Sequence, residues 1–215
     1  MTAEQLGYDT MAQTYADLIP DTFQSPLEKA AVDAFASEIR GSNLGSTIVD
    51  VGCGIGHVAA YLTDAGFTVL AVDPSTGMRE QAELAHPDLE LSADDASLST
   101  VDLSAVAGVV ARYSLIHVAP DGVREALADW ASRLPSGACI LLAGQSSDEP
   151  GVSEFDHAVA PAWRWHPDSI AEAVTDVGFT ELWRTVSRPA EGFHRFPEFH
   201  LCARTLPGNS GEFAS

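Results

Sequence analysis

Three glycines within five residues mark the segment best suited to hold a ligand. The sequence VDVGCGIGHVAAYL (49–62) runs from an apolar stretch into Gly52, Gly54 and Gly56 and then into an amphipathic stretch. Glycine lets the backbone turn sharply and leaves room for a ligand to lie against it. A second apolar stretch, VLAVDPS, contains Asp73, and an acid at this place in an α/β fold can bind ribose hydroxyls. The pattern predicts a nucleoside-containing ligand; the alternative is a tight strand-to-helix turn that binds nothing.

The glycine spacing argues against two common nucleotide-binding loops. A Walker loop ends in Gly-Lys-Ser/Thr, which does not follow here. A nicotinamide-binding loop has a third glycine where this sequence has His57, and G-x-G-x-G fits poorly to a pyrophosphate on a helix N-terminus. The sequence also lacks a recognisable Tyr-x-x-x-Lys pair. A nicotinamide oxidoreductase and a non-catalytic binding protein are therefore the weaker alternatives.

Alternating apolar and amphipathic stretches predict the scaffold that positions these residues. Short apolar runs indicate strands near 47–51, 67–72, 88–92, 107–113 and 138–143. Amphipathic stretches between them indicate helices over 55–65, 75–85 and 121–134. Right-handed crossovers then give an α/β fold, a doubly wound and mostly parallel sheet with helices on both faces. Such a sheet binds ligands at the carboxyl ends of its strands, where the strand order reverses.

The N-terminal part of the chain is expected to be helical. The spacing of apolar residues predicts helices over 9–19 and 26–40. Ser25 can cap the second helix, Pro26 suits its first position, and Glu28 completes a capping box.

The C-terminal part departs from the regular alternation. Residues 144–165 are interpreted as a polar and aromatic connection, 167–177 as a helix, and 179–187 and 197–204 as strands that pair antiparallel. We expect one domain from the length of 215 residues. Its predicted parts are a helical lid over 1–40, a ligand-binding core over 41–205 with cap elements near 145–166, and a flexible tail over 206–215.

The amino-acid composition limits the kinds of molecule that the protein is expected to bind. The sequence has 31 Asp and Glu against 11 Lys and Arg, a net charge of −20 that would repel nucleic-acid backbones and anionic lipids. No apolar run reaches the roughly 18–20 residues of a membrane span, and the first residues lack a secretory signal. The three cysteines form no CxxC pair and indicate neither disulfides nor a metal site. We expect a cytoplasmic protein, a monomer or a homodimer, that binds neither nucleic acid nor a membrane.

Five motifs in order resemble one enzyme family. VDVGCGIG, AVDPSTGM, ADDA (93–96), VVARYSLIH (109–117) and LPSGACILLAG (134–144) look like the class I S-adenosylmethionine-dependent methyltransferases, in particular the small-molecule group similar to quinone-biosynthesis enzymes. The match extends in order and spacing over about residues 8–204. The resemblance implies a Rossmann-like sheet of seven strands with the last strand antiparallel. It also implies S-adenosylmethionine as cofactor and S-adenosylhomocysteine as product.

The resemblance assigns cofactor-binding roles one residue at a time. The three glycines would approach the methionine part, Asp73 would bind the ribose, and the carbonyl of Arg112 would accept from the methionine ammonium. Asp95 would accept from the adenine amino group, and its neighbour Asp94 is the competing candidate. The implied cofactor set is Tyr15, Gly52, Gly54, Gly56, Asp73, Pro74, Ser75, Met78, Asp95, Ala96 and Arg112. Met78 could equally be a core residue.

Methyl transfer from a sulfonium is an in-line displacement, so the protein must hold the acceptor atom close to the methyl group in a dry pocket. An oxygen, carbon or nitrogen atom that is protonated at neutral pH also benefits from a general base. His117, just past the fourth predicted strand, is the candidate base; the alternative is a capping or core histidine. Tyr8, His157, Trp163 and His194 are the candidates for binding a small-molecule acceptor. A rearrangement or cyclisation on the same fold is the alternative reaction.

Overall fold

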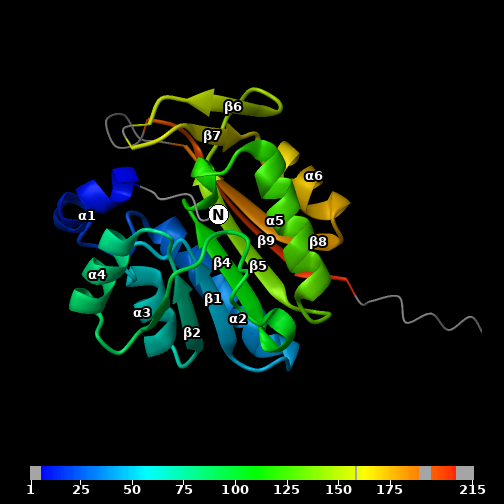
Figure 1. Cartoon of the computed structure of the whole chain (residues 1–215). Coiled ribbons are helices and arrows are strands. Elements are labelled where there is room, and N and C mark those ends of the chain that lie inside the picture. Colours follow the sequence, from blue (N-terminus) through cyan, green and yellow to red (C-terminus); the bar gives the residue numbers. More distant parts are fainter. Residues whose placement is uncertain (1–5, 158, 189–194, 207–215) are drawn as a thin grey trace, which may run out of the picture.

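A seven-stranded sheet forms the centre of the computed structural model, which describes residues 6–157, 159–188 and 195–206 (Figure 1). The strand order is β3-β2-β1-β4-β5-β9-β8. These strands are β1 (Thr47–Val51), β2 (Thr68–Val72), β3 (Glu90–Ser92), β4 (Gly108–Arg112), β5 (Cys139–Gln145), β8 (Phe179–Ser187) and β9 (Glu198–Thr205). β9 pairs antiparallel with both β5 and β8, and the other neighbours are parallel. The predicted doubly wound sheet with an antiparallel last strand is confirmed.

Helices cover both faces of the sheet (Figure 1). They are α1 (Leu6–Leu18), α2 (Pro26–Ser42), α3 (His57–Asp64), α4 (Thr76–Ala85), α5 (Pro120–Arg133) and α6 (Pro167–Asp176), with short 3₁₀ turns η1 (Leu103–Ala105) and η2 (Leu115–His117). The core on one face joins α2 and α3 to the sheet, and the core on the other joins α5 and α6 to it. None of the described helices is long and apolar enough to cross a bilayer.

Burial on both faces explains why the central strands are continuous apolar runs. Successive side chains of a strand point to opposite faces, and both faces here are covered. Val49 faces the core of α5 and α6, whereas its neighbour Ile48 faces the core of α2 and α3. Val109 and Val110 alternate in the same way in β4. The strand order reverses between β1 and β4, so the ligand edge of the sheet lies at their carboxyl ends.

The start of α2 agrees with the predicted N-cap but not with the full capping box. Ser25 Oγ accepts from the backbone N–H of Glu28 at 3.2 Å, and Pro26 occupies the first turn. The carboxylate of Glu28 accepts instead from Gln24 N–H, at 3.3 Å, and from Arg112, at 2.6 Å. The side chain of Glu28, which the sequence pattern assigned to local capping, therefore forms a buried ion pair with Arg112 instead.

The connection predicted over 144–165 contains more structure than expected. β5 continues to Gln145, and a separate antiparallel hairpin follows, made of β6 (Val152–Phe155) and β7 (Ala162–Trp165). This hairpin lies above the carboxyl edge of the sheet (Figure 1). Its two strands have four residues each and mix polar with aromatic side chains, so they gave no clear alternation. The predicted flexible tail lies, beyond Leu206, outside the described residues.

Candidate functional site

A cavity of about 480 Å³ opens at the carboxyl ends of β1 and β4, where the strand order reverses. Its volume is in the range of small-molecule sites. The wall combines α1, the loop after β1, the end of β2, the loop after β3 and the segment after β4. The predicted residues in this wall are Tyr8, Tyr15, Gly52, Gly54, Asp73, Pro74, Met78, Asp95, Ala96, Arg112, His117 and His157. The fold therefore brings most of the predicted site residues into one cavity.

The glycine loop has the backbone conformation that only glycine adopts without strain. Gly52 and Gly54 have φ of 64° and 55°, in the left-handed region. A Cβ on Gly52 would lie 2.3 Å from the Cβ of Ser114, so the loop packs directly against the segment after β4. A Cβ on Gly54 would meet no atom within 4 Å. Since Gly54 lines the cavity, its bare backbone leaves space for a ligand.

The carboxylate of Asp73 is fixed by two backbone donors. Oδ2 accepts from Gly54 N–H at 2.9 Å and Oδ1 accepts from Ser75 N–H at 2.8 Å. These bonds tie the end of β2 to the glycine loop and orient both oxygens. Burial raises the pKa of Asp73, and the two backbone hydrogen bonds oppose that shift. Each carboxylate oxygen keeps a lone pair that can accept from a ligand hydroxyl.

Asp50, next to the glycine loop in β1, is a buried acid with unused hydrogen-bonding capacity. Its side chain lines the cavity, and the residue is only 3% exposed. Oδ2 has no hydrogen-bond partner among the described residues. Burial raises the pKa of Asp50 to about 7, Arg112 lowers it, and Asp73 raises it. An unpaired buried carboxylate is costly, so this atom is suited to accept from a cationic ligand group.

Arg112 and Glu28 form a buried ion pair on the same side of the cavity. Arg112 Nη2 donates to Glu28 Oε2 at 2.6 Å, with side chains 7% and 4% exposed. Nε of Arg112 has no partner among the described residues. The pair links β4 to the first turn of α2, and Arg112 keeps one donor that could meet a ligand carboxylate.

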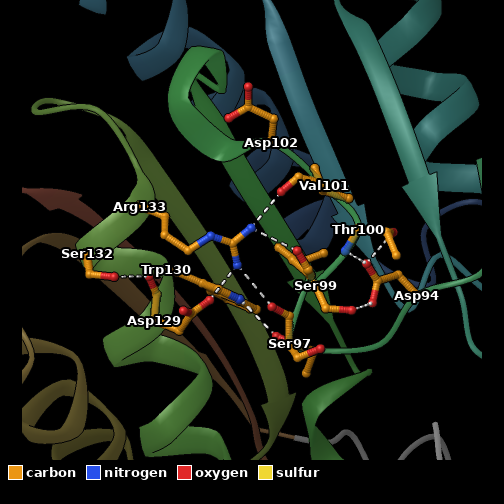
Figure 2. Close-up of polar contacts among 12 residues, drawn as sticks. Asp94, Ser97, Ser99, Thr100, Val101, Asp102, Asp129, Trp130, Ser132 and Arg133 are labelled. Atoms are coloured by element: carbon orange, nitrogen blue, oxygen red, sulfur yellow. Dashed lines mark hydrogen bonds and ion pairs between the residues drawn. The ribbon is translucent and has the colours of Figure 1, made fainter. Parts of the chain in front are cut away.

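The loop after β3 is anchored from two sides (Figure 2). On one side, Asp94 Oδ2 accepts from the backbone and the hydroxyl of Thr100, at 2.8 and 2.6 Å. On the other side, Trp130 of α5 donates to the carbonyl of Ala96 at 2.9 Å. Because Asp94 is buried and bound within the loop while Asp95 lines the cavity, the structure favours Asp95 as the ligand-facing acid.

Arg133, at the end of α5, holds the same loop through its backbone. The guanidinium donates to the carbonyls of Ser97, Leu98 and Val101 at 3.1, 2.8 and 2.6 Å. It also pairs with Asp129 one turn earlier in the helix. Leu98 is fully buried and has a φ of 48°. The side chain of Arg133 therefore stabilises a strained backbone. Sequence reasoning did not identify Arg133.

Replacing Arg133 with methionine is expected to weaken binding of S-adenosylhomocysteine by about 3- to 10-fold, because the loop that carries Asp95 loses three backbone hydrogen bonds. Isothermal calorimetry measures the change. Adenosine should lose the same factor, because the loop is expected to meet only the adenine end. Arg124→Met, on the same helix but stacked on Trp165, is the matched control. Unchanged affinity for both ligands would show that Arg133 does not contribute to ligand binding.

His117 joins three parts of the cavity wall. Nδ1 lies 3.0 Å from the carbonyl of Pro161 and Nε2 lies 2.8 Å from the hydroxyl of Tyr8. A carbonyl only accepts, so Nδ1 carries the proton and Nε2 accepts from Tyr8. The ring of His157 packs edge-on at 4.8 Å between centroids. Burial lowers the pKa of His117, the Pro161 carbonyl opposes this, and His157 lowers it further. These contacts hold a neutral imidazole at the cavity.

The N-terminal helix is docked on the glycine-loop side as well. Asp9 accepts from Ser75 Oγ at 2.6 Å and from Gly77 N–H at 2.9 Å, at the start of α4. A Cβ on Gly77 would lie 2.9 Å from the carbonyl oxygen of Asp9, so α1 approaches α4 without space for a side chain. Tyr8 and Asp9 therefore fasten α1 to opposite sides of the cavity.

Three of the predicted residues do not line the cavity, and a fourth is outside the described residues. Gly56 is the N-cap of α3, with φ of 81°, and packs on Leu89 rather than lining the cavity. Ser75 is the N-cap of α4, since its hydroxyl accepts from Met78 N–H and donates to Asp9 of α1. Trp163 lines a smaller recess beside Phe199 and does not line the cavity. His194 lies outside the described residues. The cavity lining therefore gives no support to the predicted cofactor roles of Gly56 and Ser75 or to the acceptor role of Trp163, and these roles stay predictions.

Several cavity residues were not predicted as site residues. Ser114 and Gln145 line the cavity from the ends of β4 and β5, and Glu198 lies beside Gln145 at the start of β9. Tyr113 precedes Ser114 with φ of 55°. The available signal was position: polar residues directly after two buried parallel strands fall at the ligand edge of such a sheet.

The fold and the site define a class of protein. A doubly wound sheet in this strand order, an antiparallel last strand, a glycine loop after β1 and an acid at the end of β2 are the features expected of class I methyltransferases. The comparison with known sequences agrees, because residues 48–137 match the model of the methyltransferase domain family. The chain thus contains a methyltransferase domain over residues 48–137, and S-adenosylmethionine-dependent methyltransferases share its fold.

The proteins compared below share a quarter or less of their residues with this chain. The chain is 25% identical to methyltransferase-like protein 27 of Homo sapiens, over 85% of this chain and 86% of the relative. The 1,6-didemethyltoxoflavin-N1-methyltransferase of Burkholderia thailandensis superposes with a TM-score of 0.71 at 20% identity, covering 94% of this chain and 87% of that one. The magnesium protoporphyrin IX methyltransferase of Synechocystis PCC 6803 superposes with a TM-score of 0.69 at 17% identity, covering 94% and 97%. These two structures support the fold.

Proposed function

We propose that this enzyme transfers the methyl group of S-adenosylmethionine to an oxygen, nitrogen or carbon atom of a small molecule. The observation that carries the proposal is the single cavity in which Gly54, Asp73 and Asp95, from three successive strand ends, lie with His117. Both structural relatives named above were solved with S-adenosylhomocysteine, and both are named for methyl transfer to a small molecule. Among the described residues we find no feature that favours a rearrangement or cyclisation instead.

The hydrogen-bonding groups that line the cavity fit the cofactor. Asp73 has oriented oxygens for the two ribose hydroxyls, and Asp95 with Ala96 would hold the adenine. Asp50 Oδ2 would accept from the methionine ammonium, and Arg112 Nε would donate to the methionine carboxylate. Gly54 leaves its side of the loop open. When bound, the cofactor supplies an electrophilic methyl group on a sulfonium.

The residues around His117 would remove a proton from the acceptor. Nε2 of His117 is the unprotonated ring nitrogen, and it accepts a hydrogen bond from the Tyr8 hydroxyl. We infer that an acceptor proton reaches Nε2 through Tyr8: the Tyr8 hydroxyl gives its proton to Nε2 while it takes one from the acceptor. Burial, with smaller effects of Tyr15 and Asp73, raises the pKa of Tyr8, so Tyr8 would relay a proton without remaining ionised. The lid helix that carries Tyr8 would also exclude water.

The proposal predicts that Asp73→Asn lowers the affinity for S-adenosylmethionine by about 10-fold or more, because a ribose hydroxyl loses a charged acceptor. Asparagine keeps one oxygen for the N–H of Gly54, which alanine would not, although its NH2 group cannot accept from the N–H of Ser75. Calorimetry measures the affinity, and Asp64→Asn, on the exposed end of α3, is the control. Equal affinity of Asp73→Asn and the parent chain would remove Asp73 from the site.

A further inference from the structure

Three uncharged polar side chains form one wall of the cavity, away from the residues assigned to ribose and adenine. Tyr113 and Ser114 follow β4, and Gln145 ends the neighbouring strand β5. All three line the cavity. Ser114 packs against Gly52, so this wall adjoins the glycine loop. A molecule lying against it would be next to the methionine end of the cofactor, where the transferred methyl group is.

Two atoms of this wall have hydrogen-bonding capacity to spare. Ser114 Oγ and Gln145 Oε1 are inaccessible to solvent and have no hydrogen-bond partner among the described residues. Buried polar atoms are nearly always paired in folded proteins, because an unpaired one loses its bonds to water without replacement. Ser114 can donate or accept, and the Gln145 amide offers both kinds of group. The wall is therefore suited to a ligand with a donor beside an acceptor.

Tyr113 adds a donor in a strained conformation. Its φ of 55° is in the left-handed region, which a tyrosine adopts at a cost, and its N–H is fixed by the carbonyl of Ala143 at 2.8 Å. Strain of this kind concentrates at functional sites. Burial raises the pKa of Tyr113, and Glu198 raises it further through its charge and through a hydrogen bond with the phenol, so the phenol stays protonated. Tyr113 thus presents a protonated phenol at the cavity, and a ligand would share this donor with Glu198.

The charges around the cavity select against anions. Six acidic residues line it: Asp21, Glu28, Asp50, Asp73, Asp95 and Glu198. Arg112 is the only arginine or lysine among the described residues that line it, and Glu28 already pairs with its guanidinium. A carboxylate or phosphate on the acceptor would meet a negative potential at close range. An uncharged acceptor would not.

We propose that Tyr113, Ser114 and Gln145 bind the methyl acceptor, and that the acceptor is an uncharged ring whose edge carries an N–H or O–H donor beside a carbonyl or ring-nitrogen acceptor. The inference rests on the proposed function, because it assumes that the glycine-loop side holds the cofactor. It differs from the acceptor-binding set expected from the sequence, which was Tyr8, His157, Trp163 and His194. The ring would lie between this polar wall and the rings of Tyr8 and His117.

The test uses the full-length enzyme saturated with S-adenosylhomocysteine and three probes of similar size: 2-pyridone, N-methyl-2-pyridone and benzoate. The first has an N–H beside a carbonyl, the second lacks the donor, and the third is an anion. Ligand-observed NMR titrations should show 2-pyridone binding about 10-fold tighter than either of the others. Equal or tighter binding of benzoate, or no binding of 2-pyridone, would overturn the inference.

Variants separate this subsite from the cofactor site. Gln145→Leu should weaken 2-pyridone binding by about 10-fold and change S-adenosylhomocysteine affinity by less than about 2-fold. Ser114→Ala, a smaller change, should act in the same direction. Gln81→Leu, in α4 and outside the cavity, is the matched control. If both cavity variants bind 2-pyridone like the parent chain, the subsite assignment is wrong. If the parent chain fails to bind S-adenosylhomocysteine, the proposed function itself fails.

Discussion

His117→Ala is expected to lower turnover about 100-fold or more while leaving the affinity for S-adenosylhomocysteine nearly unchanged. The imidazole provides the unprotonated Nε2 at the cavity, and a general base typically contributes about 10²–10⁴ in rate. Its removal should therefore affect kcat and kcat/KM together, the pattern of an interaction made in the transition state. Steady-state kinetics with the true acceptor, combined with calorimetry for the cofactor, measures both quantities.

The pH dependence gives a second measurement of the same role. The base acts only when unprotonated, and the environment of His117 lowers its pKa below the usual value of 6.5. Turnover should therefore fall as the pH drops through that lowered pKa and should be level above it. Tyr8→Phe should lose a comparable factor if the proton passes through Tyr8. Rescue by His117→Gln would indicate positioning without proton transfer. Full activity of His117→Ala would exclude both roles and leave His157 as the next candidate.

The sheet could be predicted because its signal is local and strong. Runs such as GVVA (108–111) are buried on both faces, and that environment favours continuous apolar residues. Ser25 and Pro26 similarly fixed the start of α2, because capping involves neighbours in the sequence. The β6–β7 hairpin was missed because its strands are short and half-exposed. Their pairing is determined by contacts with distant segments such as η2 and β5, which no local pattern reports.

The site could be predicted only where backbone and strand ends determine it. Gly52, Gly54 and Asp73 follow from the strand-loop-helix geometry. Ser75 shows the limit: its motif placed it in the cofactor set, but whether a serine caps a helix or meets a ligand depends on where its hydroxyl points. Arg133 reaches a loop more than thirty positions earlier in the chain, and such a contact leaves no trace in local sequence.

Asp50→Asn is expected to stabilise the cofactor-free enzyme at pH 8 by about 2–4 kcal/mol. The folded-state pKa of Asp50 is about 7, against 3.8 for an exposed aspartate, a difference of about 3 pKa units. Each unit corresponds to about 1.4 kcal/mol, and the pKa of about 7 already includes the attraction to Arg112. Because the folded state binds the proton more tightly, this destabilisation is absent below about pH 4, grows up to about pH 7 and is constant above.

The same substitution should weaken the binding of S-adenosylmethionine by about 10-fold or more at pH 8, because the methionine ammonium loses its anionic partner. Chemical denaturation at pH 4, 6 and 8 measures the stability, and calorimetry at pH 6 and 8 measures the affinity. The parent chain should bind the cofactor more tightly at pH 8 than at pH 6, whereas Asp50→Asn should show little such change. Asp64→Asn controls for the loss of one negative charge. Parallel pH dependences of stability in Asp50→Asn and the parent chain would show that Asp50 is not the titrating group. Opposite effects on stability and affinity would instead mean that the acid is kept in the core of β1 for the ligand it binds, at the expense of the fold that holds it.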